Sequence, residues 1–297
     1  MVNINNVRDL FLDMSDKIIN VRFDSWALGD SISWMPIIEE YRKQSGKTVM
    51  VSTFFNSIFA PVFPDIIFCQ PNNILHNVEK IYMGVKVDND KDNKFSHKNW
   101  RDQPLQKVAT DTLGMEYTPI QPKVHIPDID IPFNDYICIS EHTSRKSKYW
   151  HYENGWQNVV DYCNSRNIMV VVCSKEPTKL RNVIDRTGDH PLVNRCALIS
   201  KAKAFVGVSS GLYWVAQGTD TPSILISGAT RWTHEEMFNG YRIGTPEGFC
   251  QGCINNPKYD FNDQLDCPEN KDYECSKRIT SDMVVEKLEI IINNSVK

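Results

Sequence analysis

The segment 204–228 contains the clearest arrangement of groups for binding an anion. Two apolar runs, 204–208 and 223–226, flank a helical pattern that closes at Gly218, which is the order of a β-α-β unit. Small residues at the start of such a helix leave backbone N–H groups and the positive end of the helix dipole facing one point, where phosphate binds. The alternative is an ordinary capped helix, since the full dinucleotide fingerprint is absent. The residues expected to contact a phosphate-bearing donor are Ser209, Ser210, Gly211 and Leu212.

A carboxylate stands after the first predicted strand. The apolar run 18–23 predicts this strand, and Asp30 follows it in a loop, directly after a glycine. Open α/β sheets bind their ligands at the carboxyl ends of their strands, so Asp30 could serve there as a general base. It could equally be the N-cap of the helix that we expect from Ser31.

Two more charged residues follow predicted strands in the second half of the chain. Lys148 lies in a basic loop after the strand 136–140, where an ammonium group suits a phosphate-bearing ligand, although such loops are also common on solvated surfaces. Glu176 follows the strand 169–173 and could accept hydrogen bonds from a ribose.

Four of the nine cysteines are clustered near the C-terminus with the spacing C-x2-C-x13-C-x7-C. Thiolates at this spacing are typical of a tetrahedral metal site with no open position, which predicts a structural metal. The thiolate set alone does not separate zinc from iron. A disulfide cluster is the alternative, and a reducing compartment opposes it. The expected ligands are Cys250, Cys253, Cys267 and Cys275, whereas the expected buried single thiols are Cys69, Cys138, Cys163, Cys173 and Cys196.

These groups need two α/β units to position them. Strands alternate with helices on both sides of a proline-rich extended stretch, 120–132, which predicts two Rossmann-like domains. Two such domains with a phosphate-binding turn in the second resemble the architecture of many nucleotide-sugar glycosyltransferases, which is an analogy of fold. By this analogy we expect an N-terminal, acceptor-side domain over 1–132 and a nucleotide-sugar-binding domain over 133–297 that includes the metal knuckle 250–275. The polar segment 88–101 is expected to form a loop near the cleft.

Composition limits the classes of partner. The formal net charge of −4 gives no bulk attraction to nucleic acid or anionic membrane, and the sequence has no apolar run long enough to cross a bilayer. Acidic and amide residues interrupt the N-terminus where a signal peptide would be apolar. We therefore expect a cytoplasmic protein without a membrane partner.

The chain resembles a known family. It carries, in the family's order, the segments LGDSISWMPIIEEYRK, PLQKVATDTLGMEY, SKYWHYENGW, VGVSSGLYWVAQGTDTPSILISGAT and the run CxxC…CP…ECS. These are similar to the bacterial autotransporter heptosyltransferases, a branch of the ADP-heptose:lipopolysaccharide heptosyltransferases. The resemblance implies a GT-B fold, transfer of heptose from ADP-heptose to protein serine hydroxyls, and one structural iron per chain, with zinc as the alternative on chemistry alone.

The family's functional residues are carried over by position. The resemblance makes Asp30 the catalytic aspartate of the Gly-Asp motif and Lys148 the lysine at the donor phosphates. The turn 209–211 matches the family's donor loop and is called the donor turn below, and the four clustered cysteines match its iron ligands. The lipopolysaccharide enzymes usually have Asp-Ser/Thr-Gly and a later histidine, where this chain has the donor turn and Trp214. The autotransporter branch shares this chain's version. That branch also has a further N-terminal domain that engages the protein acceptor, so the acceptor's identity does not carry over.

The expected reaction is an inverting sugar transfer. An aspartate base activates the acceptor hydroxyl, while a lysine and backbone amides meet the departing diphosphate, so no divalent cation is required. The alternatives are another nucleotide sugar, a glycan or hydroxylated DNA base as acceptor, or a non-catalytic nucleotide-sugar-binding module. A homo-oligomer is compatible with all of them.

Overall fold

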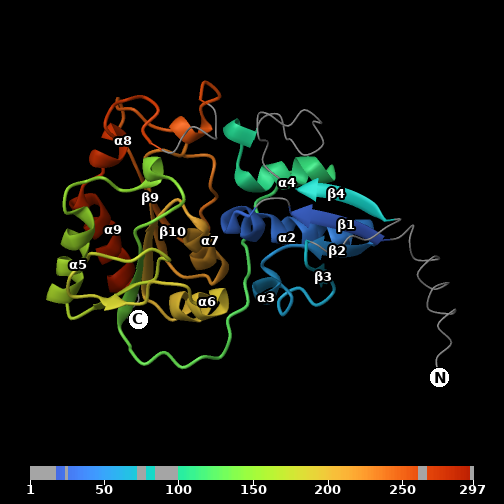
Figure 1. Cartoon of the computed structure of the whole chain (residues 1–297), viewed down its shortest axis with the longest axis horizontal. Helices are drawn as coiled ribbons and strands as arrows, with labels where there is room; N and C mark the ends of the chain where they lie inside the picture. The colour runs from blue at the N-terminus through green and yellow to red at the C-terminus, as the bar shows by residue number, and fades with distance from the viewer. Residues whose placement is uncertain (1–17, 24–25, 72–77, 84–99, 260–265, 295–297) are drawn as a thin grey trace.

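The computed structural model describes residues 18–23, 26–71, 78–83, 100–259 and 266–294. Within them the chain forms two parallel sheets, one of four strands and one of six. Figure 1 shows the sheets side by side, with helices α2 (Leu28–Ser45) and α7 (Gly211–Gly218) facing each other between them.

The first sheet has the strand order β3-β2-β1-β4, and each neighbouring pair is parallel. Its central strand β1 buries Ile19, Val21 and Phe23. Parallel neighbours need crossover connections, which here include helix α2 between β1 and β2. The strands are β1 (Ile18–Phe23), β2 (Thr48–Ser52), β3 (Ile67–Cys69) and β4 (Glu79–Met83), and the accompanying helices are α2, α3 (Asn56–Phe59), η2 (Trp100–Asp102) and α4 (Leu105–Leu113).

The second sheet has the order β10-β9-β8-β5-β6-β7, again with parallel pairs throughout. Its strands are β5 (Tyr136–Ser140), β6 (Met169–Val172), β7 (Ile184–Asp185), β8 (Ala204–Val208), β9 (Ser223–Ser227) and β10 (Gly240–Gly244). Its helices are η3 (Lys146–Lys148), α5 (Gly155–Ser165), α6 (Leu192–Ser200), α7, η4 (Cys253–Asn255), α8 (Glu274–Lys277) and α9 (Ser281–Asn294).

Both faces of the second sheet are covered, which explains why its central strands are apolar along their whole length. Every residue of β5, β8 and β9 is buried. Helices α5 and α9 pack on one face, and α6 and α7 pack on the other, between the sheet and the N-terminal half (Figure 1). The carboxyl ends of these strands thus point to one edge, next to the start of α2.

Helices α2 and α7 approach each other closely at their N-terminal ends. A Cβ on Gly29 would lie 2.7 Å from Trp214, and a Cβ on Gly211 would lie 2.8 Å from Leu28. Each glycine therefore accepts a large side chain of the other helix. The sequence analysis explained Gly211 by contact with a ligand. In the structure, the group that leaves no room for a side chain at this position is Leu28.

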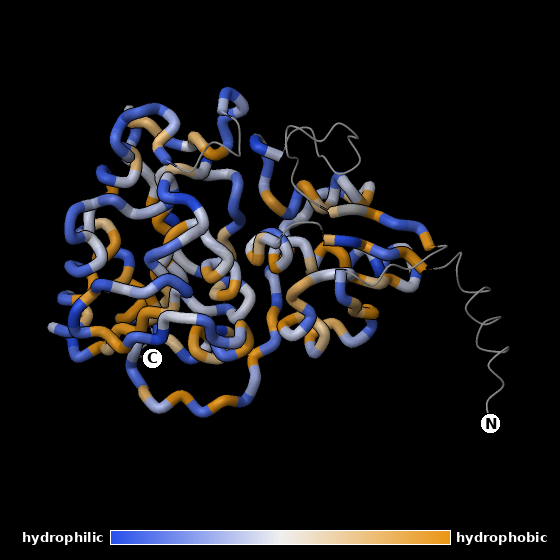
Figure 2. The backbone as a smooth tube through the Cα atoms, viewed as in Figure 1, coloured by the Kyte–Doolittle hydropathy of each residue, from blue (hydrophilic) through white to orange (hydrophobic). Residues whose placement is uncertain are grey.

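The segment that joins the two sheets, 115–133, has no helix or strand. Figure 2 shows apolar and polar residues alternating along it, and Figure 1 shows it passing from the N-terminal half to the second sheet along the bottom of the view. It is fixed to the second half by the bond from the Val124 amide to the Gly218 carbonyl, 3.2 Å. The exact domain boundary at 132/133 stays a prediction.

Some sequence expectations need correction. Helix α2 begins at Leu28, so Asp30 is in its first turn and not in a preceding loop, and the N-cap residue is Ala27. Asp30 is therefore no helix cap. Cys69 is half-buried, beside the Ser52 hydroxyl, while the other four single cysteines are buried as expected. The loop expected at 88–101 lies mostly outside the described residues.

Among the residues that the structure describes, no helix combines the length and the apolar character needed to cross a membrane. The longest of them, α2, has 18 residues and carries charges in its first and last turns.

Candidate active site

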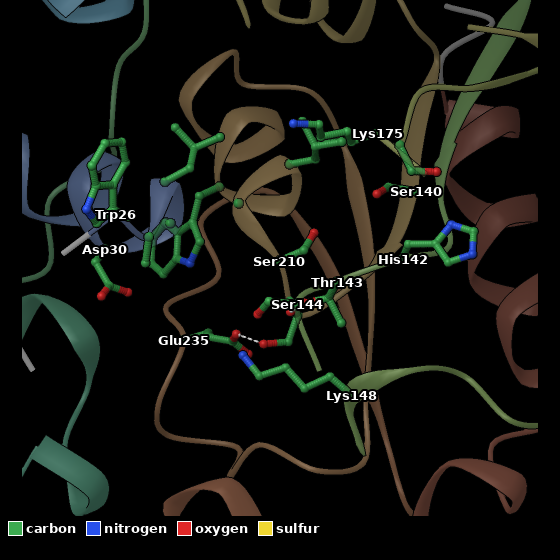
Figure 3. A pocket seen from close by; sticks show the side chains of 18 of the residues that line it. Trp26, Asp30, Ser140, His142, Thr143, Ser144, Lys148, Lys175, Ser210 and Glu235 are labelled. Atoms are coloured by element: carbon green, nitrogen blue, oxygen red, sulfur yellow. Dashed lines mark hydrogen bonds between the residues drawn. The ribbon is translucent and has the colours of Figure 1, made fainter. Parts of the chain in front are cut away.

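A cavity of about 440 Å³ lies at the carboxyl ends of the strands, against the α2–α7 contact. Figure 3 shows Trp26 and Asp30 on one side of it, and His142, Thr143 and Lys148 on the other. The structure brings to this single cavity every residue that the sequence assigned to catalysis or donor binding: Asp30, Lys148, Glu176, Ser209, Ser210, Gly211 and Leu212.

Asp30 reaches the cavity from the first turn of α2 (Figure 3). A carboxylate is stabilised there by the helix dipole. Beside it Trp26 is 72% exposed, and its indole stacks on Phe54 with ring centroids 3.4 Å apart. The side of the cavity formed by the N-terminal half thus has one carboxylate and a flat aromatic surface.

The two serines of the donor turn differ in their hydrogen bonding. Ser210 occupies the N-cap position of α7 but makes no side-chain cap bond, and its buried Oγ has no partner among the described residues. The Ser209 hydroxyl instead donates to Glu235. Of the two hydroxyls, only that of Ser210 is available to a ligand.

Lys148 is half-buried at the end of η3, and it extends toward Glu235 (Figure 3). Burial lowers the pKa of Lys148, while the negative charges of Glu235 and Asp30 act in the opposite direction. The two other basic residues of this loop, Arg145 and Lys146, do not line the cavity.

Glu176 is exposed at the rim of the cavity, just beyond β6. Deeper in, the hydroxyls of Ser140 and Ser174 are buried and have no partner among the described residues. Buried hydroxyls are normally hydrogen-bonded, so these two are suited to a polar ligand. Sequence reasoning missed both, although each stands at the end of a predicted strand.

Glu235 and Arg242 form a buried ion pair that sequence reasoning also missed. Arg242 Nη2 lies 2.6 Å from Glu235 Oε2, and their side chains are 4% and 5% exposed. Burial alone would raise the pKa of Glu235, but Arg242, Lys148 and His234 outweigh it, and the pKa is lowered. Glu235 is therefore an ionised carboxylate that lines the cavity.

The neighbouring Glu236 links the two halves of the protein outside the cavity. Its Oε1 accepts from the Gln106 amide at the start of α4, 3.0 Å, and from the Tyr117 hydroxyl, 3.2 Å. Burial raises the pKa of Glu236 to about 7. When the pKa of an acid is higher in the folded than in the unfolded state, the folded protein loses stability as the pH rises from the unfolded-state pKa through the folded-state pKa.

We expect Glu236→Gln to remove this loss, because glutamine has no charge to desolvate. The unfolding free energy of the variant minus that of the wild type should increase by about 2 kcal/mol from pH 5 to pH 8. Tm measured at both pH values tests this. Glu116→Gln, an exposed neighbour of Tyr117, is the control. Parallel pH dependence of wild type and Glu236→Gln would refute the assignment.

The four clustered cysteines lie together at the end of β9 without forming a metal site in this structure. Cys253 and Cys275 are buried, and all nine cysteines are free thiols. Burial, together with the other three thiols of the set, raises the pKa of Cys253 to about 12. Within the described residues, no group of three or more ligands is placed to hold a metal ion. The predicted knuckle is therefore not shown, although the four thiols are close enough for their charges to interact.

The cysteine segment also contacts the N-terminal half. Arg101 Nη1 donates to the Asn256 carbonyl, 2.9 Å, and to the Ile254 carbonyl, 3.4 Å. Among the described residues, none of the four cysteines lines the cavity. The segment thus supports the junction of the two halves and leaves the cavity wall to other residues.

Comparison with known proteins agrees with this architecture. A model of glycosyltransferase family 9 (heptosyltransferase) matches residues 102–239. The autotransporter heptosyltransferase Aah of Escherichia coli is 28% identical over 93% of this chain and 74% of its own length. The autotransporter heptosyltransferase TibC of Escherichia coli H10407 is 25% identical over 93% of this chain and 72% of its own length.

Solved structures show the same fold. The crystal structure of TibC, described as an iron-containing dodecameric glycosyltransferase, matches with a TM-score of 0.84 and 23% identity, over 96% of this chain and 78% of TibC. TibC has also been solved in complex with ADP-D-beta-D-heptose. The E. coli heptosyltransferase WaaC, with ADP-2-deoxy-2-fluoro heptose, matches with a TM-score of 0.57 and 11% identity, over 91% of this chain and 99% of WaaC.

Two parallel α/β sheets with the cavity at their junction define a GT-B glycosyltransferase fold. The chain is a glycosyltransferase of the heptosyltransferase class, and it is similar over nearly its whole length to the autotransporter heptosyltransferases. The resemblance inferred from the sequence motifs is confirmed.

Proposed function

We propose that this protein transfers heptose from ADP-heptose to a hydroxyl group of a protein acceptor, a serine by family resemblance, with inversion at the anomeric carbon. The observation that carries the proposal is the meeting of Asp30, Lys148 and the donor turn in one cavity. The ADP-heptose complex of TibC supports the choice of donor.

In the proposed reaction, Asp30 takes the proton of the acceptor hydroxyl as its oxygen attacks the anomeric carbon. The bond from that carbon to the diphosphate breaks at the same time, and the leaving group carries the electron pair. Because Asp30 belongs to the N-terminal half and the donor turn to the C-terminal half, base and donor approach from opposite sides, as inversion requires.

The negative charge that develops on the diphosphate is met by Lys148 and by the backbone amides of Ser210 and Gly211 at the start of α7. The unpartnered hydroxyls of Ser140, Ser174 and Ser210 supply further donors for the nucleotide or the sugar. Glu176 is proposed to hold the ribose. With these groups in place, the reaction requires no divalent cation.

A donor screen tests the assignment. The protein is incubated with ADP-heptose, UDP-sugars or GDP-sugars and a serine-containing passenger segment of an autotransporter, and nucleotide release and acceptor mass are followed. We expect ADP release together with a heptose mass on a serine. Release from another donor would reassign the sugar. Transfer only to a glycan or a hydroxylated DNA base would reassign the acceptor, and binding without release would indicate a non-catalytic module.

We further propose that Cys250, Cys253, Cys267 and Cys275 hold one structural iron, as the iron-containing TibC suggests, in a cytoplasmic homo-oligomer. Burial and the neighbouring thiols raise the pKa of Cys250, Cys253 and Cys275, and such a cluster suits a cation, because coordination removes the thiol protons. Zinc remains the alternative, since it accepts the same ligands.

Replacing one ligand should separate the metal from catalysis. We expect Cys253→Ser to lose the metal and to lower Tm by about 5 °C or more, because the metal holds a segment with little apolar core of its own. The matched control is Cys69→Ser, a half-buried thiol outside the set. Elemental analysis of both variants and of the wild type is the measurement. A wild type that is folded, active and free of metal would contradict the proposal.

A further inference from the structure

Glu235 lies in the loop between β9 and β10, where it joins three parts of the donor site. Its Oε1 accepts from Ser209 in the donor turn, and its Oε2 accepts from Thr230, 3.2 Å, and from Arg242, 2.6 Å. The carboxylate thus ties β10 and the end of β9 to the turn before α7. Neither the family motifs nor the sequence patterns assigned it a role.

Arg242 keeps this carboxylate charged and is itself held firmly. Its Nη2 also reaches the Ser227 hydroxyl, 3.1 Å, its Nη1 donates to the Trp232 carbonyl, and its guanidinium lies over the Trp232 ring. A buried charge without a partner is costly, so Glu235 and Arg242 depend on each other. The pair is neutral, and the charge of Lys148 remains for an anionic ligand.

Lys148 is the second group that Glu235 acts on. Burial lowers the pKa of Lys148, and among the negative charges that oppose this effect Glu235 has the largest influence. Without it, the lysine would lose its proton at a lower pH. The other titratable or charged groups around the two side chains are Asp30, Arg145, Tyr213, His234, Glu236, Arg242 and Cys253.

We propose that Glu235 is a positioning residue of the donor site: it fixes the Ser209 end of the donor turn and holds the Lys148 ammonium charged and aimed at the diphosphate. The inference rests on the proposed function, because it takes a nucleoside diphosphate as the ligand. A second contact fixes the same turn: the Thr143 hydroxyl donates to the Ser209 carbonyl, 3.1 Å.

The test measures the affinity for ADP as a function of pH, without any sugar transfer. For Glu235→Gln we expect about tenfold weaker ADP binding at pH 7.5, the size of one hydrogen bond to a charged group. The loss should grow toward pH 9.5 faster than in the wild type, because Lys148 then loses its proton earlier. The measurement uses ADP alone, so it stays valid if the transferred sugar is not heptose.

The double variant Glu235→Gln/Arg242→Gln removes the unpaired buried charge, and circular dichroism checks that it folds. If Glu235 served only to neutralise Arg242, the double variant would bind ADP like the wild type, and Glu235→Gln would bind it more tightly. Either result overturns the proposal. Weaker binding by both variants, with a steeper pH dependence, supports it. The control is Glu39→Gln, which breaks the 2.8 Å pair with Arg42 on α2, outside the cavity lining.

Discussion

Replacing Asp30 by alanine is expected to lower the rate of sugar transfer by about 10²–10⁴-fold, the usual contribution of a general base, while ADP affinity stays near that of the wild type. The reason is geometric. Asp30 enters the cavity from α2, across from Lys148 in Figure 3, so we expect it to meet the acceptor hydroxyl and not the diphosphate. Single-turnover transfer and ADP binding, measured on the same preparation, separate the two effects.

The same substitution removes a carboxylate from a helix N-terminus, which by itself costs roughly 0.3–1 kcal/mol of stability. Asp282→Ala is the matched control, because Asp282 stands in the first turn of α9, away from the cavity. We expect it to lose similar stability and no activity. A transfer rate in Asp30→Ala above about a tenth of the wild-type rate would mean that Asp30 is not the base.

The sequence predicted the buried strands well because their signal is local. In β5, β8 and β9 nearly every residue is apolar, and a continuous apolar run between turn residues specifies a strand covered on both faces. The edge strands β4, EKIYM, and β10, GYRIG, were missed although each has five residues, like β5, β8 and β9, because two charged residues begin β4 and glycine and arginine interrupt the apolar residues of β10. Only their pairing with β1 and β9 identifies them.

The start of α2 was misplaced for a different reason. Its N-cap is Ala27, which offers no capping side chain, and a glycine at the second helical position normally disfavours a helix. What fixes the helix there is the fit of Gly29 against Trp214, more than 180 residues away in the chain. No local pattern contains that contact.

Site residues were predicted where they follow the end of a strand or lie in a turn of small residues. They were missed where their burial depends on partners that are distant in the sequence. The segment around Glu235, RWTHEEMFNG, has the composition of a polar surface loop. Its two glutamates are held in the interior by Arg242 from β10 and by Gln106 and Tyr117 from the N-terminal half. Carboxylates are rarely buried without such partners, so sequence reasoning had no ground to place them there.

Replacing Lys148 by alanine is expected to weaken ADP binding and also to slow transfer, since the ammonium group meets the diphosphate before and during bond breaking. We expect about a 100-fold loss in kcat/KM for the donor, the size found when one preorganised donor to a developing anion is removed. Loss of ADP affinity distinguishes this variant from Asp30→Ala, whose defect is confined to transfer. Isothermal titration with ADP and initial-rate kinetics give both quantities.

The neighbouring Lys146 provides the control, because it belongs to the same short helix η3 but is exposed and does not line the cavity. Lys146→Ala should bind ADP and transfer sugar like the wild type. Lys148→Arg should keep part of the binding, since it retains the charge but cannot place it at the same point. If Lys148→Ala bound ADP as tightly as the wild type, the diphosphate would lie elsewhere in the cavity, and the N–H groups at the start of α7 would be left as its main contact.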